Sequence, residues 1–485
     1  MPYDLLIAGG GINGCAIARE ASLNGLSVLL VEKDDLAGHT SSASTKLIHG
    51  GLRYLENYQF RLVYEGLHER ERLLAAAPHL IRPMAFVLPH AHALRPWWMV
   101  RAGLYLYDLL AGASSLPGSR GLSARDEAYT DPLAGTHRGF VYSDAWVDDA
   151  RLTLANAVDA AAHGAEIATR TSLLSARREG PLWHVELSDG RKVEARCFVN
   201  AAGPWVMDLI GRAGISTASR VRLVKGSHIV VPRLFDGDHA YILQQPDRRI
   251  VFAIPYEDRF TEIGTTDVPV EKPEDAGCSA EEVTYLCTAV NRYFTRKVGP
   301  SDVAWSWSGV RPLHDDGSKA AQSVTRDYLL ELDEDGAPAL SVFGGKITTA
   351  RALGEEAVEK IGKVLGIETR ACTRARVFPG GAIPAFEHFL DQVRGRWPFL
   401  GDARSRRMAR AYGSLLGEML RDVHEETAMG EAFGAGLTEI EARWMHAREW
   451  ARTPEDVLFR RSKLGLHLSE AERARFTAWW QATIA

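Results

Sequence analysis

The sequence predicts an α/β protein with three parts: a Rossmann-type dinucleotide-binding domain that is discontinuous along the chain, a mixed β-sheet domain and an α-helical C-terminal domain. An apolar run at residues 3–8 enters a glycine-rich turn almost at the N-terminus, as a nucleotide-binding unit does. Residues 221–267 alternate in β fashion, and glycine-rich turns occur on both sides of them. From about Thr373 onward the pattern becomes helical and rich in charge.

The first element is a strand–turn–helix–strand unit. A helix is expected over residues 15–24, ended by Gly25, and a second strand over residues 27–31. Glu32 follows that strand at the position where a carboxylate accepts hydrogen bonds from ribose hydroxyls. The turn matches G-x-G-x-x-G through Gly9, Gly11 and Gly14. Because all parts follow in order, the unit predicts dinucleotide binding rather than a structural glycine turn, but it does not separate NAD from FAD.

The next element, residues 40–55, concentrates hydroxyl groups with Lys46, His49, the pair Gly50 and Gly51, and an arginine. A core strand or helix would need a buried partner for each of these polar groups. A segment that runs along a pyrophosphate and then turns under a redox ring uses all of them. We therefore expect this stretch to be the second part of the cofactor site.

Later elements bring more backbone towards the cofactor. An alanine-rich helix is expected over residues 148–163, and a hairpin over residues 183–195. The strand at 196–203 runs into Gly203, and a helix follows from Pro204. A third glycine element at 344–349 opens a helix, whose N-terminus would stabilise negative charge on a reduced ring.

The C-terminal region carries helix-start patterns. Thr438 with Glu441, and Ser469 with Glu472, match capping boxes, and Thr453 precedes a proline at a first helical position. The predicted division places the cofactor domain at residues 1–78, 139–215 and 301–370, the substrate domain at 79–138 and 216–300, and the helical domain at 371–485.

Composition excludes several classes of protein. The 485 residues are 46% hydrophobic and 25% charged, with a formal net charge of −5, which gives no reason to expect nucleic-acid binding. Five cysteines without a C-x-x-C pair predict a reducing compartment, with neither a disulfide framework nor a metal site. The first apolar run leads straight into the glycine turn, so no signal peptide is expected.

At this point the sequence resembles the FAD-dependent, quinone-linked glycerol-3-phosphate dehydrogenases, within the D-amino-acid-oxidase-like flavoprotein superfamily. The motifs that carry the resemblance span almost the whole chain in the expected order. They lie at residues 9–14, 40–56, 200–205, 264–267, 308–313, 341–349 and 454–464. The resemblance implies FAD as the cofactor, bound noncovalently.

The glycine motifs and the resemblance together predict the residues that contact the cofactor. They are Gly9, Gly11, Asn13, Gly14, Glu32, Thr40, Ser41, Ser42, Lys46, His49, Gly50, Gly51, Ala201, Gly203, Gly309, Gly345, Lys346, Ile347 and Thr348.

The implied reaction is oxidation of sn-glycerol 3-phosphate to dihydroxyacetone phosphate, with hydride transfer from C2 to flavin N5. Arginine suits the phosphate because its planar fork meets phosphate oxygens in pairs. Arg53 and Arg311 each follow a glycine-containing stretch, and the resemblance places both in the substrate pocket with Tyr54 and Lys346. Arg311 or Lys346 could also take part in catalysis by lowering the pKa of the C2 hydroxyl.

The base that removes the C2 proton is less well defined by the sequence. His49 should lie near the flavin ring, as a base or a flavin-tuning residue, and histidine is the natural base near neutral pH. His228 lies in the second domain and could face the pocket. Thr266 could either bind substrate or stabilise a turn.

Residues 96–110 form an apolar, aromatic helix whose two charges, Arg101 and Asp108, fall on one narrow stripe two turns apart. The helix could lie on a membrane surface, as electron transfer to a membrane quinone would require, or it could be a core helix with a small polar edge. No stretch is long and apolar enough to span a bilayer. We expect a cytoplasmic protein bound peripherally to the inner face of the membrane.

Other functions remain open at this stage. A glycerol-phosphate oxidase would share the first half-reaction and use oxygen. A flavin-binding sensor or assembly protein would not need Arg53, Arg311 and Lys346 together. An amine or amino-acid oxidase would bind a carboxylate, for which one arginine commonly suffices. The charged C-terminal helices could form a homodimer contact or cover the flavin domain.

Overall fold

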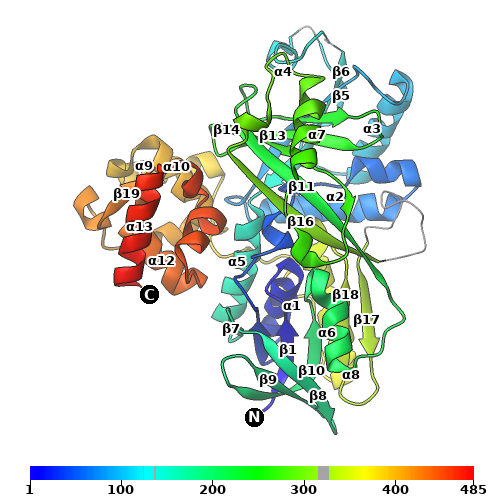
Figure 1. The fold of residues 1–485 in the computed structure, drawn as a ribbon, viewed down its shortest axis with the longest axis vertical. Coiled ribbons are helices and arrows are strands. Elements are labelled where there is room, and N and C mark those ends of the chain that lie inside the picture. The colour runs from blue at the N-terminus through cyan, green and yellow to red at the C-terminus, as the bar shows by residue number, and fades with distance from the viewer. Residues whose placement is uncertain (124, 136–137, 315–326, 485) are drawn as a thin grey trace.

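The structure is a computed structural model that describes residues 1–123, 125–135, 138–314 and 327–484. Figure 1 shows two sheet-containing regions stacked along the long axis and a helical C-terminal region packed against one side of them. The lower region contains both β1 and the N-terminus. This arrangement confirms the predicted α/β class, with a mixed second sheet and a helical C-terminal part.

The nucleotide-binding sheet has eight strands, and its central strands are parallel. It runs in the order β17 (Leu329–Asp333), β18 (Ala339–Phe343), β10 (Lys192–Asn200), β1 (Tyr3–Ala8), β2 (Val28–Val31) and β7 (Glu166–Ala168), and the hairpin β8 (Leu173–Glu179) and β9 (Leu182–Leu187) joins it through β10. Strands β17, β18 and β10 come from distant parts of the chain, so the domain is discontinuous, as predicted.

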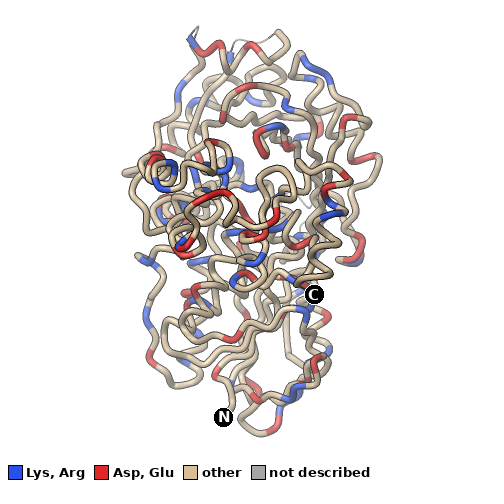
Figure 2. Tube along the Cα trace, turned by 90° about the vertical axis from the view of Figure 1, so that its left-hand side faces the viewer, with Lys and Arg blue, Asp and Glu red and all other residues tan. Residues whose placement is uncertain are grey.

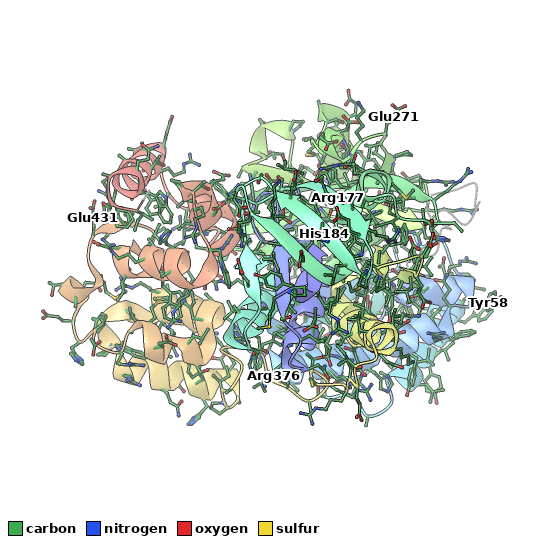
Figure 3. The ribbon with its side chains drawn as sticks, turned by 90° about the horizontal axis from the view of Figure 1, so that it is seen from below. Tyr58, Arg177, His184, Glu271, Arg376 and Glu431 are labelled. Atoms are coloured by element: carbon green, nitrogen blue, oxygen red, sulfur yellow. The ribbon has the colours of Figure 1, made fainter. Side chains whose placement is uncertain are left out.

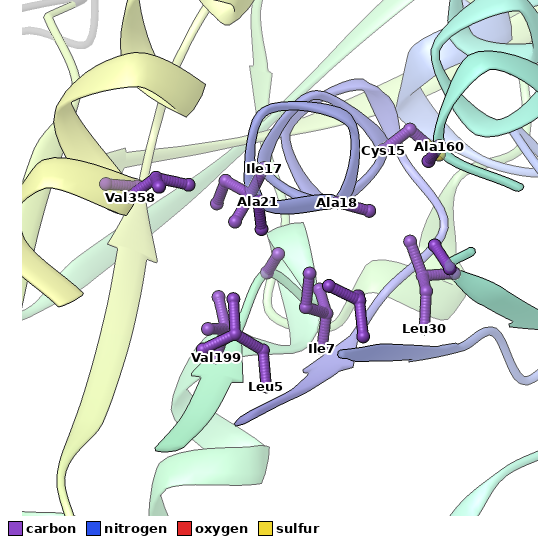
Figure 4. Close-up of a cluster of buried hydrophobic side chains, with 14 of the residues drawn as sticks. Leu5, Ile7, Cys15, Ile17, Ala18, Ala21, Leu30, Ala160, Val199 and Val358 are labelled. Atoms are coloured by element: carbon purple, nitrogen blue, oxygen red, sulfur yellow. The ribbon is translucent and has the colours of Figure 1, made fainter. Parts of the chain in front are cut away.

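Burial on both faces explains why β1 is a continuous apolar run. Leu5 and Ile7 point to the face covered by α1 (Ile12–Leu23), where they meet Ile17 and Ala21. Figure 4 shows this layer, with side chains of the helix above those of the strands. Small alanines on α1 let α5 (Asp149–Ala162) and α8 (Ala350–Leu365) pack closely beside it.

The second sheet has ten strands and is mostly antiparallel. Its order is β15 (Val268–Pro269), β11 (Val221–Pro232), β14 (Phe260–Gly264), β13 (Ile250–Tyr256), β12 (Ala240–Gln244), β4 (Ile81–Pro89), β6 (Gly139–Val147) and β3 (Leu47–Ile48), with β16 (Trp305–His314) paired to β11 and β5 (Arg120–Gly121) to β6. The helices of this region and its links are α2 (Phe60–Ala76), α3 (Trp97–Ala111), α4 (Glu127–Thr130) and α7 (Ala280–Asn291), whereas α6 (Val206–Ala213) packs on the nucleotide-binding sheet.

Sheet membership departs from the predicted division at residues 139–147 and 305–314. Both segments were expected in the cofactor domain, but β6 pairs with β4 and β16 pairs with β11, all in the second sheet. Strand β3 from the 40–55 stretch also pairs with β6. The chain therefore crosses between the two regions through strands β3, β6 and β16.

The C-terminal region packs α9 (Phe386–Arg396), α10 (Gly401–Tyr412), α11 (Leu416–Met419), α12 (Glu439–Glu449) and α13 (Glu470–Thr483) around its own apolar core, with a small hairpin of β19 (Ala432–Gly434) and β20 (Leu437–Thr438). Ser469 and Glu472 form the predicted capping box. The box predicted at Thr438 is wrong, because Glu441 accepts hydrogen bonds from Arg407 and Tyr412 instead.

Buried ion pairs join this region to the cofactor domain. Asp148 caps α5 and binds Lys463 Nζ at 2.6 Å, whereas its neighbour Asp149 binds Lys46 Nζ at 2.9 Å. Arg461, in the π-helical turn η10 (Asp456–Arg461), holds Asp35 at 2.8 Å. Figure 2, in which the C-terminal region faces the viewer, shows both signs of charge interspersed along the chain. The C-terminal region thus covers part of the flavin domain, which was one of the two roles expected for it beside a homodimer contact.

Candidate active site

A groove of about 370 Å³ lies where β1, β2 and β10 of the nucleotide-binding sheet end. Its walls include Gly9, Gly11, Ala201, Gly203 and Gly345. Close packing explains two of the glycines that form its turn: a Cβ on Gly9 would lie 2.4 Å from the Ala201 oxygen, and one on Gly14 would lie 2.0 Å from the Gly9 oxygen. The backbone of the predicted turn therefore approaches both the neighbouring strand and the groove.

Two polar side chains define the chemistry of this groove. Glu32 accepts hydrogen bonds from the Gly10 amide at 2.7 Å and the Asp34 amide at 2.9 Å, and its carboxylate still has lone pairs for ribose hydroxyls. Asn13 donates to the Gly344 oxygen at 3.1 Å, whereas its buried Oδ1 has no hydrogen-bond partner among the described residues. An unpaired acceptor at the wall of a glycine-lined groove fits a ligand with hydroxyl or N–H donors, as FAD has.

The 40–46 segment divides between the groove and the protein interior. Thr40 and Ser41 line the groove; Ser41 Oγ accepts from the first amide of α1, that of Ile12, at 2.9 Å. Ser42 and Lys46 line an adjoining hollow of about 190 Å³, which shares His39, Thr40 and Trp205 with the groove. Lys46 is buried and donates to the Ser42 oxygen and to Asp149, so it holds the segment in place. The contacts of Ser42 and Lys46 with the cofactor stay predictions.

The third glycine element lies against Asn13 of the glycine turn. Gly345 has a φ of +101°, and a Cβ there would meet the Asn13 side chain at 2.7 Å. Thr348 Oγ1 accepts from the His49 amide at 3.4 Å. This bond joins the helix start to the turn at residues 49–51, called the flavin turn below. Gly309 and Ile347 do not line the groove: Gly309 packs on Ala43, and Ile347 packs on an apolar cluster.

Sequence reasoning missed the residues that close the outer end of the groove. The His39 ring lies 4.6 Å from the Trp205 ring, and Lys33 Nζ lies 4.4 Å from the same indole. Trp205 belongs to the predicted motif at 200–205, so its position beside a glycine turn was the available signal. His39 and Lys33 have no comparable pattern in the sequence.

A second cavity, of about 580 Å³, lies on the far side of the flavin turn. Its lining contains both polar side chains, called the polar wall below, and apolar side chains, called the apolar wall. The polar wall includes His49, Arg53, Tyr54, Gln244, Thr265 and Asp267. The apolar wall includes Leu88, Met99, Val100, Leu106, Ile242, Ile250 and Phe252. Gly51, with a φ of +79°, lets the chain turn tightly against the Tyr54 ring.

Two of the predicted substrate residues, Arg53 and Tyr54, line the cavity, and two others, Arg311 and Lys346, contact residues that line it. Lys346 Nζ lies 3.9 Å from the centre of the Tyr54 ring. Arg311 donates to Asp267 at 2.7 Å and to Thr265 at 3.2 Å, and both acceptors line the cavity. Arg311 and Lys346 therefore lie next to lining residues of the cavity, although the segments that carry Arg53 and Lys346 are separated by some 290 residues of sequence.

Two predicted substrate residues lie elsewhere. His228 has no exposed surface; its Nε2 lies 2.9 Å from Thr45 Oγ1 and its ring stacks on Trp307. Burial, with Arg311 and Lys46 nearby, holds the pKa of His228 well below its usual value, so it is neutral. Thr266 is buried and donates to Glu282 at 2.6 Å, while Thr265 takes the place at the cavity wall. These contacts of Thr266 agree with the turn-stabilising alternative.

Helix α3 forms part of the apolar wall and exposes an apolar face. Trp98, Tyr105 and Leu109 are 63–67% exposed along one side. Arg101 and Asp108 both bind Ser119, away from that side. The predicted charge stripe is confirmed, but the helix is not a fully buried core helix. A search of the described ranges finds no helix with the length and hydropathy to cross a membrane.

Comparisons with known proteins agree with this geometry. A family model described as "FAD dependent oxidoreductase" matches residues 4–358. A D-erythritol 1-phosphate dehydrogenase of Brucella abortus is 49% identical, covering 98% of this chain and 97% of that protein. The aerobic glycerol-3-phosphate dehydrogenase of Escherichia coli is 48% identical over the same shares of the two chains.

A solved structure is similar over nearly the whole length. The glycerol-3-phosphate dehydrogenase of Bacillus halodurans, complexed with FAD, superposes with a TM-score of 0.76 at 26% identity, covering 99% of this chain and 94% of that one. The similarity therefore includes the C-terminal region as well as the two sheets.

Proposed function

Because this chain belongs to the family of FAD-dependent oxidoreductases, we propose that it oxidises sn-glycerol 3-phosphate to dihydroxyacetone phosphate and passes the electrons to a membrane quinone. Its cofactor is FAD. The observation that carries the proposal is the lining of the 580 Å³ cavity, in which Arg53, Tyr54 and Thr265 occur together with apolar side chains.

The polar end suits a polyol phosphate. Arg53 and Arg311 supply planar donors for phosphate oxygens, and Lys346, held over the Tyr54 ring, adds a further cation. Asp267 orients the Arg311 guanidinium, and Thr265 offers a hydroxyl at the same wall. Several cations in one place match a phosphate dianion better than a single carboxylate.

His49 is the candidate base for the C2 hydroxyl proton. It lines the cavity, and its amide is tied to Thr348 at the start of the helical segment that leads into α8. His228 is excluded from this role because it is buried outside the cavity. Cations at the polar wall would lower the pKa of the bound hydroxyl and ease the loss of its proton.

When bound, FAD would supply a ring that accepts one hydride, which carries two electrons and a proton. The described residues that would hold its nucleotide are Glu32, Asn13 and the glycine turn, and Ser41 lies at the start of α1 where the pyrophosphate is expected. The segment from Gly345 to Thr348 would place a helix N-terminus beside the ring, where it stabilises negative charge.

The apolar end of the cavity supports a membrane quinone as the acceptor. Met99, Val100 and Leu106 of α3 line it, and the outer face of the same helix is apolar. Exposed Tyr58 and Tyr64 lie on the adjoining segment, and Figure 3 shows Tyr58 at the edge of the molecule opposite Glu431 of the C-terminal region. Tryptophan and tyrosine favour the bilayer interface. The protein would thus bind peripherally, at the inner face of the cell membrane.

A second substrate deserves a direct comparison. Cavities of about 300–1,000 Å³ enclose drug-sized ligands, so a cavity of about 580 Å³ has room beyond a triose phosphate. A tetritol phosphate is one hydroxymethyl group longer, and one relative at 49% identity is named a D-erythritol 1-phosphate dehydrogenase. We therefore keep D-erythritol 1-phosphate as the alternative donor.

Anaerobic titration of the holoenzyme tests these assignments. The flavin absorbance is followed while sn-glycerol 3-phosphate, D-erythritol 1-phosphate or sn-glycerol 1-phosphate is added. We expect sn-glycerol 3-phosphate to bleach the flavin promptly. The other two compounds should reduce the flavin at least tenfold more slowly at the same concentration. Faster bleaching by the tetritol phosphate would select the alternative, and a flavin that none of them reduces would refute both.

The acceptor is identified in the same sample. A short-chain ubiquinone or air-saturated buffer is mixed with the reduced enzyme, and the return of the flavin colour is timed. We expect the quinone to act at least tenfold faster than oxygen. The opposite order would identify an oxidase.

A further inference from the structure

A buried hydrogen-bond chain supports the flavin turn from below. The amide of Gly50 donates to Tyr107 Oη at 2.9 Å. Tyr107 lies on the inner face of α3 and is only 1% exposed. Its hydroxyl donates a hydrogen bond to the carboxylate of Asp144 on β6, whose oxygens lie 2.8 and 2.9 Å away. Because the phenol donates to a carboxylate, its oxygen is oriented to accept the Gly50 N–H.

The acid at the end of this chain is itself held firmly. Asp144 is buried and receives Arg70 Nη1 at 2.8 Å. Arg70, on α2, also donates to the Ser143 oxygen and to Ser114 Oγ. Burial raises the pKa of Asp144 to about 6, against the lowering effect of Arg70 and Tyr107. The chain thus links α2, β6 and α3 to one peptide of the cofactor turn.

Space around Gly50 is as restricted as its hydrogen bonding. A Cβ on Gly50 would lie 2.6 Å from Leu67 Cγ and 2.9 Å from Tyr107 Oη. One on Gly66 would lie 3.1 Å from the Gly50 Cα. The turn is therefore packed against α2 and α3 on one side, while its neighbours His49 and Gly51 line the cavity on the other.

We propose that Tyr107 is a positioning residue for the oxidation: its hydroxyl, oriented by Asp144, fixes the Gly50 peptide and so keeps His49 at the cavity wall. Tyr107 lines neither the nucleotide groove nor the substrate cavity, so it acts through the turn and not by touching substrate. The role in the reaction rests on the proposed function. The effect on the turn does not, and it can be measured without any substrate.

The test compares Tyr107→Phe with Tyr105→Phe in the FAD-loaded enzyme. Both changes remove one phenol hydroxyl from α3, but Tyr105 is 63% exposed and two residues away. Hydrogen exchange of a peptide covering residues 47–52 reports the turn. We expect at least tenfold faster exchange at Gly50 in Tyr107→Phe and no change in Tyr105→Phe.

The kinetic arm measures flavin reduction by sn-glycerol 3-phosphate. For Tyr107→Phe we expect the limiting reduction rate to fall about tenfold, with KM changed less than twofold and FAD retained. Asp144→Asn keeps an acceptor for the phenol and should fall between wild type and Tyr107→Phe. Should Tyr107→Phe not fold, Asp144→Asn carries the same comparison.

The outcomes separate the two ideas. Unchanged exchange at Gly50 would overturn the structural claim, and faster exchange with wild-type reduction would overturn the role in the reaction. A wild-type flavin that no polyol phosphate reduces would refute the proposed function. In that case the exchange experiment alone would decide whether Tyr107 holds the turn.

Discussion

The guanidinium of Arg311 is paired with the carboxylate of Asp267, with Nη1 2.7 Å from Oδ1. The pair joins β16 to the residue directly before β15, and Asp267 lines the substrate cavity. Asp267 fixes the direction of the guanidinium, and Thr265, a second acceptor of Arg311, also lines the cavity. A dianionic substrate must therefore bind within the field of both charges, and the cations Arg53 and Lys346 offset the carboxylate.

Replacing Arg311 with alanine should weaken both substrate binding and turnover. A hydrogen bond to a charged group contributes about 1.5–3 kcal/mol, or about 10- to 150-fold in an equilibrium constant. We expect KM for sn-glycerol 3-phosphate to rise by about that factor and kcat to fall, while FAD stays bound. Arg311→Lys keeps the charge without the fork and should recover part of the loss. Steady-state kinetics with unchanged constants, or loss of the flavin, would remove Arg311 from the pocket.

Gly345→Ala should impair FAD binding. The backbone there has a φ of +101°, and the new Cβ would meet Asn13, whose Oδ1 is one of the acceptors kept for the cofactor. We expect the Kd for FAD to rise at least tenfold, measured by reconstitution of the stripped protein. Gly211→Ala is the matched control, because its Cβ would meet nothing within 4 Å. Equal affinities for the two variants would contradict the placement of Gly345.

The outer face of α3 should determine membrane binding. The triple variant Trp98→Ser, Tyr105→Ser, Leu109→Ser removes three apolar side chains, each contributing about 1.5–3 kcal/mol when fully buried. We expect at least a tenfold loss of flotation with vesicles of bacterial phospholipid, with flavin reduction by substrate preserved. A triple variant at the exposed positions Leu174, Val377 and Leu329 should float as the wild type does. If it too detaches, general surface hydrophobicity is responsible rather than α3.

Glu262 should make stability depend on pH. It is fully buried with no hydrogen-bond partner for either oxygen among the described residues, and burial raises its pKa from 4.5 to about 8. In the unfolded chain it ionises near pH 4.5, so unfolding releases a proton between the two values. Stability is therefore lost as pH rises from about 4.5 to 8.

Glu262→Gln removes this titration. We expect its melting temperature to exceed that of the wild type by several degrees at pH 9, and the difference to shrink towards pH 5. Glu271→Gln, at an exposed position, serves as the control. Differential scanning fluorimetry across this range checks the prediction, and a gap that is the same at both pH values would contradict it.

The cofactor groove was largely predictable because its signals are local. The glycines at 9–14, the acid at Glu32 and the turn at Gly203 each lie beside the strand that delivers them, so spacing alone places them. The ion pair of Lys46 was not predictable for a tertiary reason: its partner Asp149 lies about a hundred residues away in the sequence.

The direction in which a side chain points was harder to predict than the segment in which it lies. Thr265 and Thr266 are neighbours, yet one lines the cavity and the other is buried against Glu282. His228 lies on a strand where alternate residues face opposite sides, and the pairing of β11 with β14 and β16 decides which side is buried. The helix at α3 could not be assigned from its pattern, because it lines a cavity on one side and meets solvent on the other.

Asp148 and Asp149 stand next to each other on α5, and one binds the C-terminal region while the other binds the cofactor segment. Lys463 of the C-terminal region and Lys46 of the 40–55 segment therefore bind the start of the same helix. A shift of either lysine would disturb the other. A fragment ending at residue 370 would leave Asp148 without Lys463 and Asp35 without Arg461. The helical region therefore cannot be removed without breaking these ion pairs. In chimaeras of this enzyme it should be exchanged together with α5.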